Sequence, residues 1–86
     1  MAYQIKLEKL AEKNLDRLDK PTRERIIDFL YTKVRVNPLL HREPLRGNKK
    51  GLWKYRVGDY RIICAIKNNE LVVLVIEIGH RREIYN

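Results

Sequence analysis

Three strand-like segments follow one another in the second half of the chain, with only two or three residues between neighbours. Residues 52–57 alternate between apolar and polar side chains, residues 60–67 are mostly apolar, and residues 71–78 are apolar on both faces. The dipeptides Gly-Asp at 58–59 and Asn-Asn at 68–69 suit tight hairpin turns. Strands joined by such turns run antiparallel, and a strand that is apolar on both faces lies in the middle of a sheet. This half of the chain is therefore predicted to form a three-stranded meander.

The first half carries one strand and two amphipathic helices. Residues 3–7 alternate, which predicts a short strand. From residue 8 the apolar residues recur at helical spacing, and residues 19–21 separate two helices, because proline fits the first turn of a helix but not its interior. We expect both apolar stripes to be buried against the sheet. The first stripe is Leu10, Ala11, Leu15 and Leu18; the second is Ile26, Ile27, Leu30, Tyr31 and Val34.

These elements predict an α+β fold in the order β-α-α-β-β-β. Two N-terminal helices pack on one face of a small, mostly antiparallel four-stranded sheet. The chain has 86 residues, too few for two hydrophobic cores, so residues 1–86 are expected to form a single domain. Residues 39–51 hold proline, glycine and asparagine and are predicted to be a mobile basic loop. Three of its cations are candidates for contact with a polyanion: Arg46, Lys49 and Lys50.

The charge of the chain points to a polyanionic partner. Nineteen Lys and Arg against eleven Asp and Glu give a formal net charge of +8, which favours nucleic acid, an anionic membrane or an acidic protein, although solubility alone is an alternative. One cysteine and two histidines exclude a disulfide scaffold, a cysteine zinc site and a histidine cluster, so no metal or cofactor is expected. Without a membrane-length apolar run or an apolar signal region, we expect a cytoplasmic protein with no membrane partner.

Basic residues on the meander form the first candidate site. Lys54 and Arg56 are two residues apart and therefore share a sheet face. Pairing around the turn at 58–59 puts Arg56 opposite Arg61, an arrangement of like charges that costs stability. A bound anion between the two arginines would explain why the sequence keeps this pairing. The alternative is that both side chains extend into water.

The C-terminal tail adds further polar groups beside this pair. It follows the predicted central strand, and its candidates are His80, Arg81, Arg82 and Tyr85. Together with the strand cations they are expected to line one concave face that holds a phosphodiester and stabilises the charge that builds up during cleavage. RNA brings its own nucleophile, the 2′-OH. Taken alone, His80 could equally cap a turn, and Tyr85 is better explained by packing.

Three short motifs resemble the RelE toxins of the RelE/ParE superfamily, the toxins of type II toxin–antitoxin pairs. They are Leu-Arg-Gly at 45–47, Trp-Lys-Tyr-Arg-Val-Gly-Asp-Tyr-Arg-Ile-Ile at 53–63, and Gly-His-Arg-Arg-Glu-Ile-Tyr at 79–85. The order of elements and the length agree as well, so the resemblance spans nearly the whole chain. It implies a metal-independent endoribonuclease, an mRNA interferase that cuts messenger RNA in the ribosomal A site by 2′-OH attack and so inhibits translation.

The same resemblance implies roles for individual residues. Lys54 and Arg56 match basic residues that contact phosphate and take part in proton transfer, and Arg61 matches the arginine that stabilises the transition state. Arg81 matches the arginine on the scissile phosphate, although Arg82 could exchange with it. Tyr85 matches the tyrosine that orients the substrate or stacks on it. His80 stands where some members carry lysine or histidine.

The resemblance also implies partners. One is the ribosome with its mRNA, which Arg46, Lys49 and Lys50 of the basic loop are expected to contact. The other is a cognate antitoxin that is acidic and partly disordered when free. Two other functions remain open. One is a ParE-like inhibitor of DNA gyrase, which shares the fold without RNA chemistry. The other is a nucleic-acid-binding module without catalysis.

Overall fold

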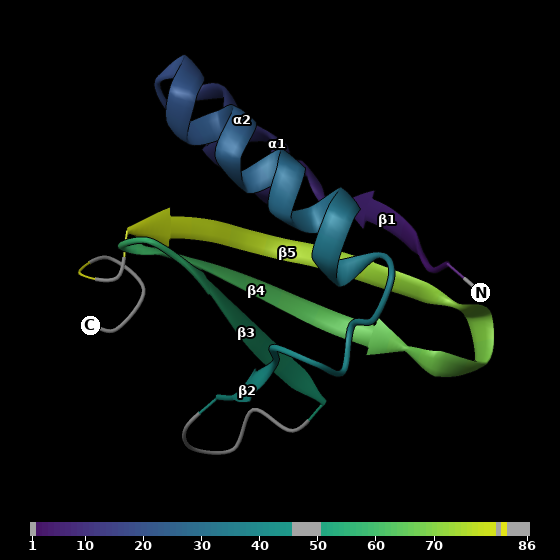
Figure 1. Ribbon diagram of the computed structural model, residues 1–86. Helices are drawn as coiled ribbons and strands as arrows, with labels where there is room; N and C mark the ends of the chain where they lie inside the picture. The colour runs from purple at the N-terminus through teal and green to yellow at the C-terminus, as the bar shows by residue number, and fades with distance from the viewer. Residues whose placement is uncertain (1, 46–50, 81, 83–86) are drawn as a thin grey trace.

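Two helices lie on one side of a twisted sheet in the computed structural model, which describes residues 2–45, 51–80 and 82 (Figure 1). The strands are β1 (Gln4–Leu7), β2 (Glu43–Pro44), β3 (Leu52–Val57), β4 (Tyr60–Lys67) and β5 (Val72–His80). The helices are α1 (Lys9–Asp16) and α2 (Lys20–Phe29), followed by a π-helical turn η1 (Leu30–Val34); a 3₁₀ turn η2 (Asn68–Glu70) joins β4 to β5. In the described ranges no helix has both the length and the apolar character to cross a membrane.

The sheet is mixed and has the strand order β1-β5-β4-β3-β2. β1 runs parallel to β5, and the other neighbours are antiparallel. The predicted α+β class, the meander and the single helical layer are confirmed. The predicted count of four strands is wrong, because Glu43–Pro44 adds a fifth strand to the edge of β3. A two-residue strand leaves no periodic trace in a sequence, and proline, which lacks an N–H donor, is tolerated at an edge. This strand also replaces part of the predicted loop at 39–51.

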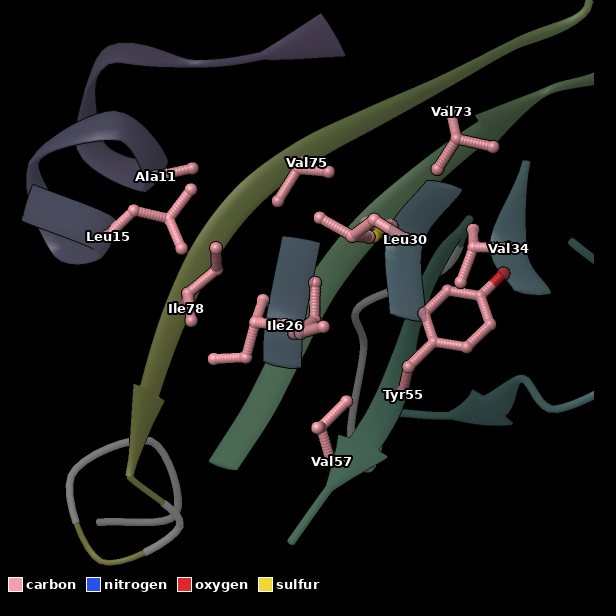
Figure 2. Packing of buried hydrophobic residues seen from close by; sticks show 12 residues of the cluster. Ala11, Leu15, Ile26, Leu30, Val34, Tyr55, Val57, Val73, Val75 and Ile78 are labelled. Carbon is pink, nitrogen blue, oxygen red and sulfur yellow. The ribbon is translucent and has the colours of Figure 1, made fainter. Parts of the chain in front are cut away.

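The hydrophobic core lies between the helices and the sheet (Figure 2). Ala11 and Leu15 from α1 pack over β5, and Ile26, Leu30 and Val34 follow the inner side of α2 and η1. Their sheet partners, all buried, are Tyr55, Val57, Ile62, Cys64, Val73, Val75 and Ile78. The sheet face toward the helices is thus filled by apolar groups, which leaves polar chemistry to the other face and to the ends of the strands.

The buried stripes are narrower than predicted. Leu10, Ile27 and Tyr31 were expected in the core but are 48%, 38% and 47% exposed. Each helix contacts the sheet along one row of residues spaced by four, such as Ile26 and Leu30. The residues directly before or after those in this row point toward solvent. Large apolar side chains therefore remain on the outer surface of the helical layer.

The two meander turns differ from each other. Gly58 has φ of +60°, so the β3–β4 turn uses glycine where a side chain would be strained, as predicted. At the other turn Asn68 and Asn69, expected to form a tight hairpin turn, lie in the 3₁₀ turn η2, and the residue with positive φ is Leu71, at +54°. The Oδ1 of Asn68 accepts a hydrogen bond from the Tyr3 hydroxyl at 2.9 Å, a contact between residues far apart in the sequence.

Candidate functional site

The register of the sheet brings two arginines together on the face away from the helices. Arg56 of β3 is the direct partner of Arg61 of β4, as the hairpin predicted. Lys54 shares this face through the two-residue period of β3, and its partner on β2 is Glu43. Three cations and one carboxylate therefore occupy adjacent positions on three strands.

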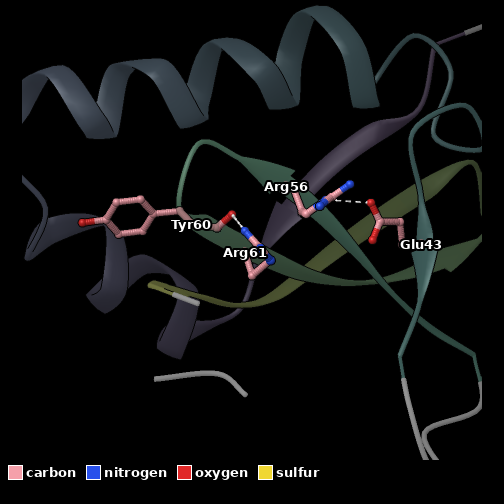
Figure 3. Close-up of polar contacts among 4 residues, drawn as sticks. All are labelled: Glu43, Arg56, Tyr60 and Arg61. Atoms are coloured by element: carbon pink, nitrogen blue, oxygen red, sulfur yellow. Dashed lines mark hydrogen bonds and ion pairs between the residues drawn. The ribbon is translucent and has the colours of Figure 1, made fainter. Parts of the chain in front are cut away.

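A hollow of about 430 Å³ lies beside this cluster and is lined by Phe29, His41, Glu43, Arg56, Gly58 and Arg61. We call it the arginine hollow. Glu43 Oε2 lies 2.8 Å from Arg56 Nε, and this ion pair is solvent-accessible, the two side chains being 36% and 60% exposed (Figure 3). Arg61 is only 7% exposed, and its Nη1 donates to the Tyr60 carbonyl at 3.2 Å. The hollow thus combines one recessed and one accessible guanidinium.

The other sequence-predicted residues are distributed differently. Lys54 lies on the same face but does not line the arginine hollow. Arg82 is exposed beyond the end of β5. Five candidates lie outside the described residues, and their roles stay predictions: Arg46, Lys49, Lys50, Arg81 and Tyr85.

His80 lies on the helix side of the sheet, and its predicted place beside the arginine pair is wrong. It is the partner of Tyr60 in the β4–β5 ladder, one position beyond the pairing of Arg61 with Gly79, so its side chain points to the opposite face. The rings of His80 and Tyr60 meet edge to face with centroids 5.5 Å apart. His80 Nδ1 accepts a hydrogen bond from the Arg82 backbone N–H at 3.3 Å, which is the turn-capping contact that the sequence left open.

Two lining residues were not singled out from the sequence as chemical groups. His41 and Glu43 come from the segment that was expected to be a mobile loop, and both line the arginine hollow. The sequence did contain a signal for Glu43, because it is the only acidic residue between Asp28 and Asp59. A lone carboxylate in a long basic stretch is a candidate counter-ion.

A buried tyrosine holds this segment against the sheet. The Tyr55 hydroxyl donates a hydrogen bond to the Pro38 carbonyl, and both residues are fully buried. Burial raises the pKa of Tyr55 above its ordinary value, so the hydroxyl remains a donor throughout the neutral range. The contact anchors the chain three residues before His41 and five before Glu43.

Comparison with known proteins identifies the family. Residues 5–85 match the family described as the ParE toxin of the type II toxin–antitoxin system parDE. The chain belongs to the RelE/ParE toxin superfamily. The toxin is 30% identical to Toxin RelE of Mycobacterium tuberculosis over 83 residues, which is 96% of this chain and 86% of that protein.

Solved structures agree with this assignment. The fold matches a RelBE toxin–antitoxin complex from M. tuberculosis with a TM-score of 0.88 at 23% identity, covering 94% of this chain and 93% of that one. It also matches the intact Escherichia coli RelBE toxin–antitoxin complex with a TM-score of 0.79 at 26% identity, covering 92% and 96%. The predicted resemblance is therefore confirmed at the level of family and fold.

The chemistry that the toxin's arginine hollow offers is anion binding beside a proton acceptor. Guanidinium groups form strong, often bidentate, hydrogen bonds to phosphate oxygens. Glu43 and His41 are the residues in the lining that can accept or donate a proton. Among the residues that the structure describes, no three His, Cys, Asp or Glu side chains lie close enough together to hold a metal ion.

Proposed function

We propose that this toxin is a ribosome-dependent endoribonuclease that cleaves messenger RNA in the A site. One observation carries the proposal: Arg56 and Arg61, directly paired across the β3–β4 hairpin, share a hollow with a carboxylate. Paired like charges on a sheet are unfavourable unless something negative lies between them. A phosphodiester supplies that charge and gains negative charge as it reacts, so the same guanidinium groups bind the transition state more strongly.

The reaction is a transfer within the RNA. The 2′-oxygen forms a bond to the adjacent phosphorus, and the bond from phosphorus to the 5′-oxygen breaks, leaving a 2′,3′-cyclic phosphate. Glu43, beside Arg56, accepts the proton of the 2′-OH. His41, in the same lining, donates a proton to the departing 5′-oxygen. In this scheme Arg61 holds the non-bridging oxygens from its recessed position, and Arg81 and Tyr85 keep their predicted roles on the phosphate and the base.

Dependence on the ribosome is supported by charge and by kinship. A net charge of +8 on 86 residues favours a polyanionic surface such as ribosomal RNA, and the toxin is related to a protein named Toxin RelE. Arg46, Lys49 and Lys50 are proposed to contribute to that contact. Action on translating ribosomes also places the toxin in the cytoplasm.

A reconstituted translation reaction with mapping of new 5′ ends tests the proposal. We expect cuts within the A-site codon, only when ribosomes are present. Arg61→Ala is expected to slow them by about 10²–10³-fold, the range seen when one transition-state donor is removed. Arg17→Ala is the matched control, because Arg17 is exposed on the helical layer and lines no part of the arginine hollow. Intact mRNA, or equal cleavage by the Arg61 variant in a folded protein, would refute the proposal.

The proposed neutralising partner is an acidic antitoxin that is partly disordered when free. The similar M. tuberculosis and E. coli structures are toxin–antitoxin complexes. Exposed apolar side chains on the helical layer, among them Leu10, Ile27 and Tyr31, would be buried by such a chain. Co-expression with a candidate acidic antitoxin should yield a stable complex and restore growth; recovery of free, toxic protein would argue against this partner.

Inhibition of DNA gyrase is the second candidate, because the matching family is described as a ParE toxin. A gyrase assay on supercoiled DNA separates the two. Trapped cleavage complexes with intact mRNA in the translation assay would favour gyrase. Cleaved mRNA with normal gyrase turnover would favour the ribonuclease.

A further inference from the structure

A second hollow lies on the helix side of the β3–β4 turn. It has a volume of about 370 Å³, within the range of small-molecule sites. Its lining combines one guanidinium, two ring side chains and the turn itself: Thr22, Arg25, Ile26, Val57, Gly58, Asp59, Tyr60 and His80. We call it the turn hollow. It contains the histidine that the register directs away from the arginine pair, and Figure 3 shows the Tyr60 ring pointing away from the Arg56–Glu43 pair.

A third hollow connects the turn hollow to the arginine hollow. It has a volume of about 300 Å³ and shares Phe29, Arg56 and Gly58 with the arginine hollow. It shares Arg25, Val57 and Gly58 with the turn hollow. The three hollows therefore follow one another around the tip of the hairpin, with Arg56 at one end and Arg25 at the other.

Gly58 lines all three hollows and lies close to Arg25. A Cβ atom at this position would lie 3.1 Å from Arg25 Nη1, closer than ordinary van der Waals contact. The absence of a side chain lets the Arg25 guanidinium lie against the turn, where Arg25 lines both the third hollow and the turn hollow. An RNA strand that leaves Arg56 would enter the third hollow, whose described lining adds two cations, Arg25 and Lys33, and one carboxylate, Asp28.

We propose that the turn hollow binds a nucleotide of the RNA strand next to the cleaved phosphodiester, an inference that rests on the proposed function. Arg25 holds the phosphate, and the rings of Tyr60 and His80 offer surfaces on which a base can stack. Among the described residues of the lining, Asp59 is the one carboxylate. It would repel a free phosphate or an acidic peptide, but it can accept a hydrogen bond from the amino group of a base.

The first experiment measures binding of labelled oligoribonucleotides from two to eight nucleotides long to the intact toxin. A 2′-deoxy substitution at the cleavage position keeps them uncut. The affinity of the parent protein is expected to rise with oligonucleotide length. The Arg25→Gln variant should bind the shortest oligonucleotide as tightly as the parent does, but its affinity should not rise for the longer ones. The slope of log K against log salt should fall by about 0.7 for the long oligonucleotides, the value for one lost phosphate contact on a single strand. Arg25→Lys keeps the charge and should recover most of that slope.

Arg17→Gln is the matched control, because it removes the same charge from an exposed site outside all three hollows. An Arg25→Gln effect equal at all lengths, or equal to that of the control, would overturn the proposal. So would unchanged binding, or an effect on antitoxin affinity alone. Arg25→Gln that leaves binding unchanged while A-site cleavage stays normal refutes the turn hollow and not the ribonuclease. Length-dependent binding that requires Arg25, together with intact mRNA in the A-site assay, refutes the ribonuclease and not the turn hollow.

A second experiment tests whether the messenger supplies the nucleotide. Ribosomes are programmed with messages that extend past the A site or end within it, and cleavage by the parent and Arg25→Gln is compared. A defect seen only with the extended message assigns the nucleotide to the messenger. An equal defect with both messages would overturn the proposal, because the contact would then be to ribosomal RNA and not to the cleaved strand. Cleavage unchanged with both messages would overturn the proposal.

Discussion

The contact between Tyr55 and the Pro38 carbonyl makes a direct prediction about stability. Tyr55 lies in the core with none of its surface exposed, and Pro38 is also fully buried. The Tyr55 hydroxyl donates to the Pro38 carbonyl across 17 positions of the chain. Tyr55→Phe keeps the ring, and with it the packing against Phe29 at a centroid distance of 6.1 Å, and removes only the donor.

The loss is expected to be large for a single oxygen atom. A buried carbonyl without its donor costs about 1–3 kcal/mol, whereas a typical exposed hydrogen bond contributes far less. Taking a loss of about 1.5 kcal/mol, and about 4–8 °C per kcal/mol for a domain of this size, the Tm of Tyr55→Phe should fall by roughly 6–12 °C. The slope of unfolding free energy against urea should stay the same, because the area buried in the fold is unchanged.

Urea and thermal unfolding followed by far-UV circular dichroism measure both quantities. Tyr31→Phe is the matched control: Tyr31 is 47% exposed, so its loss should stay within about 0.5 kcal/mol. If the two variants are equally stable, the hydroxyl of Tyr55 does not hold the segment that leads to Glu43, and the reasoning is refuted. A loss near the expected value together with slower A-site cleavage would tie the anchor to the arginine hollow.

Three further perturbations give distinct outcomes. Glu43→Gln should change the unfolding free energy by less than about 1 kcal/mol, because its ion pair is exposed, yet slow A-site cleavage by about 10²–10⁴-fold; unchanged cleavage would exclude Glu43 as the base. Burial raises the pKa values of Cys64 and Tyr55, so the unfolded chain loses these protons first as the pH rises. In urea titrations the stability that these two groups contribute should be fully present below about pH 8.5. The ratio of folded to unfolded protein should then fall about tenfold per pH unit, as unfolded Cys64 loses its proton, and about hundredfold per unit above about pH 10, as unfolded Tyr55 does too. Cys64→Ala should remove the fall that begins near pH 8.5, and a fall that persists would show that Cys64 does not cause it. Gly58→Ala should lower the unfolding free energy by about 1–2 kcal/mol, because φ is +60° there, and should displace Arg25; an unchanged Tm would contradict this.

The fold was largely predictable because its signals are local. Alternation in residues 52–57 and the glycine at position 58 determined the hairpin and its register, and hence the pairing of Arg56 with Arg61. The edge strand Glu43–Pro44 was not predictable, since two residues carry no period and form a strand only because β3 offers an unpaired edge. The exposure of Leu10 and Tyr31 also depends on tertiary structure, because the sheet decides how wide a stripe each helix can bury.

The candidate site was predictable only in part. Residues on β3 and β4 could be placed by counting, but His80 could not, because its face depends on the register between β4 and β5. That register shifts at Ile63 and Cys64, where the ladder is irregular. A sequence gives the period of a strand but not the position of a bulge, and one extra residue reverses every side chain beyond it.

The pairing of Glu43 with Arg56 explains how a carboxylate can serve as a base within a cationic hollow. In the free toxin the pair is exposed, so opening it costs only about 0.2–1 kcal/mol. A phosphodiester that enters between Arg56 and Arg61 forms charge-assisted bonds to both guanidinium groups and competes with Glu43 for Arg56. The displaced carboxylate remains on β2, beside the bound strand, and no longer contacts the Arg56 guanidinium. Substrate binding would thereby release the base at the position where the 2′-OH must be deprotonated, and an RNA mimic should weaken the Glu43–Arg56 contact before any bond is cut.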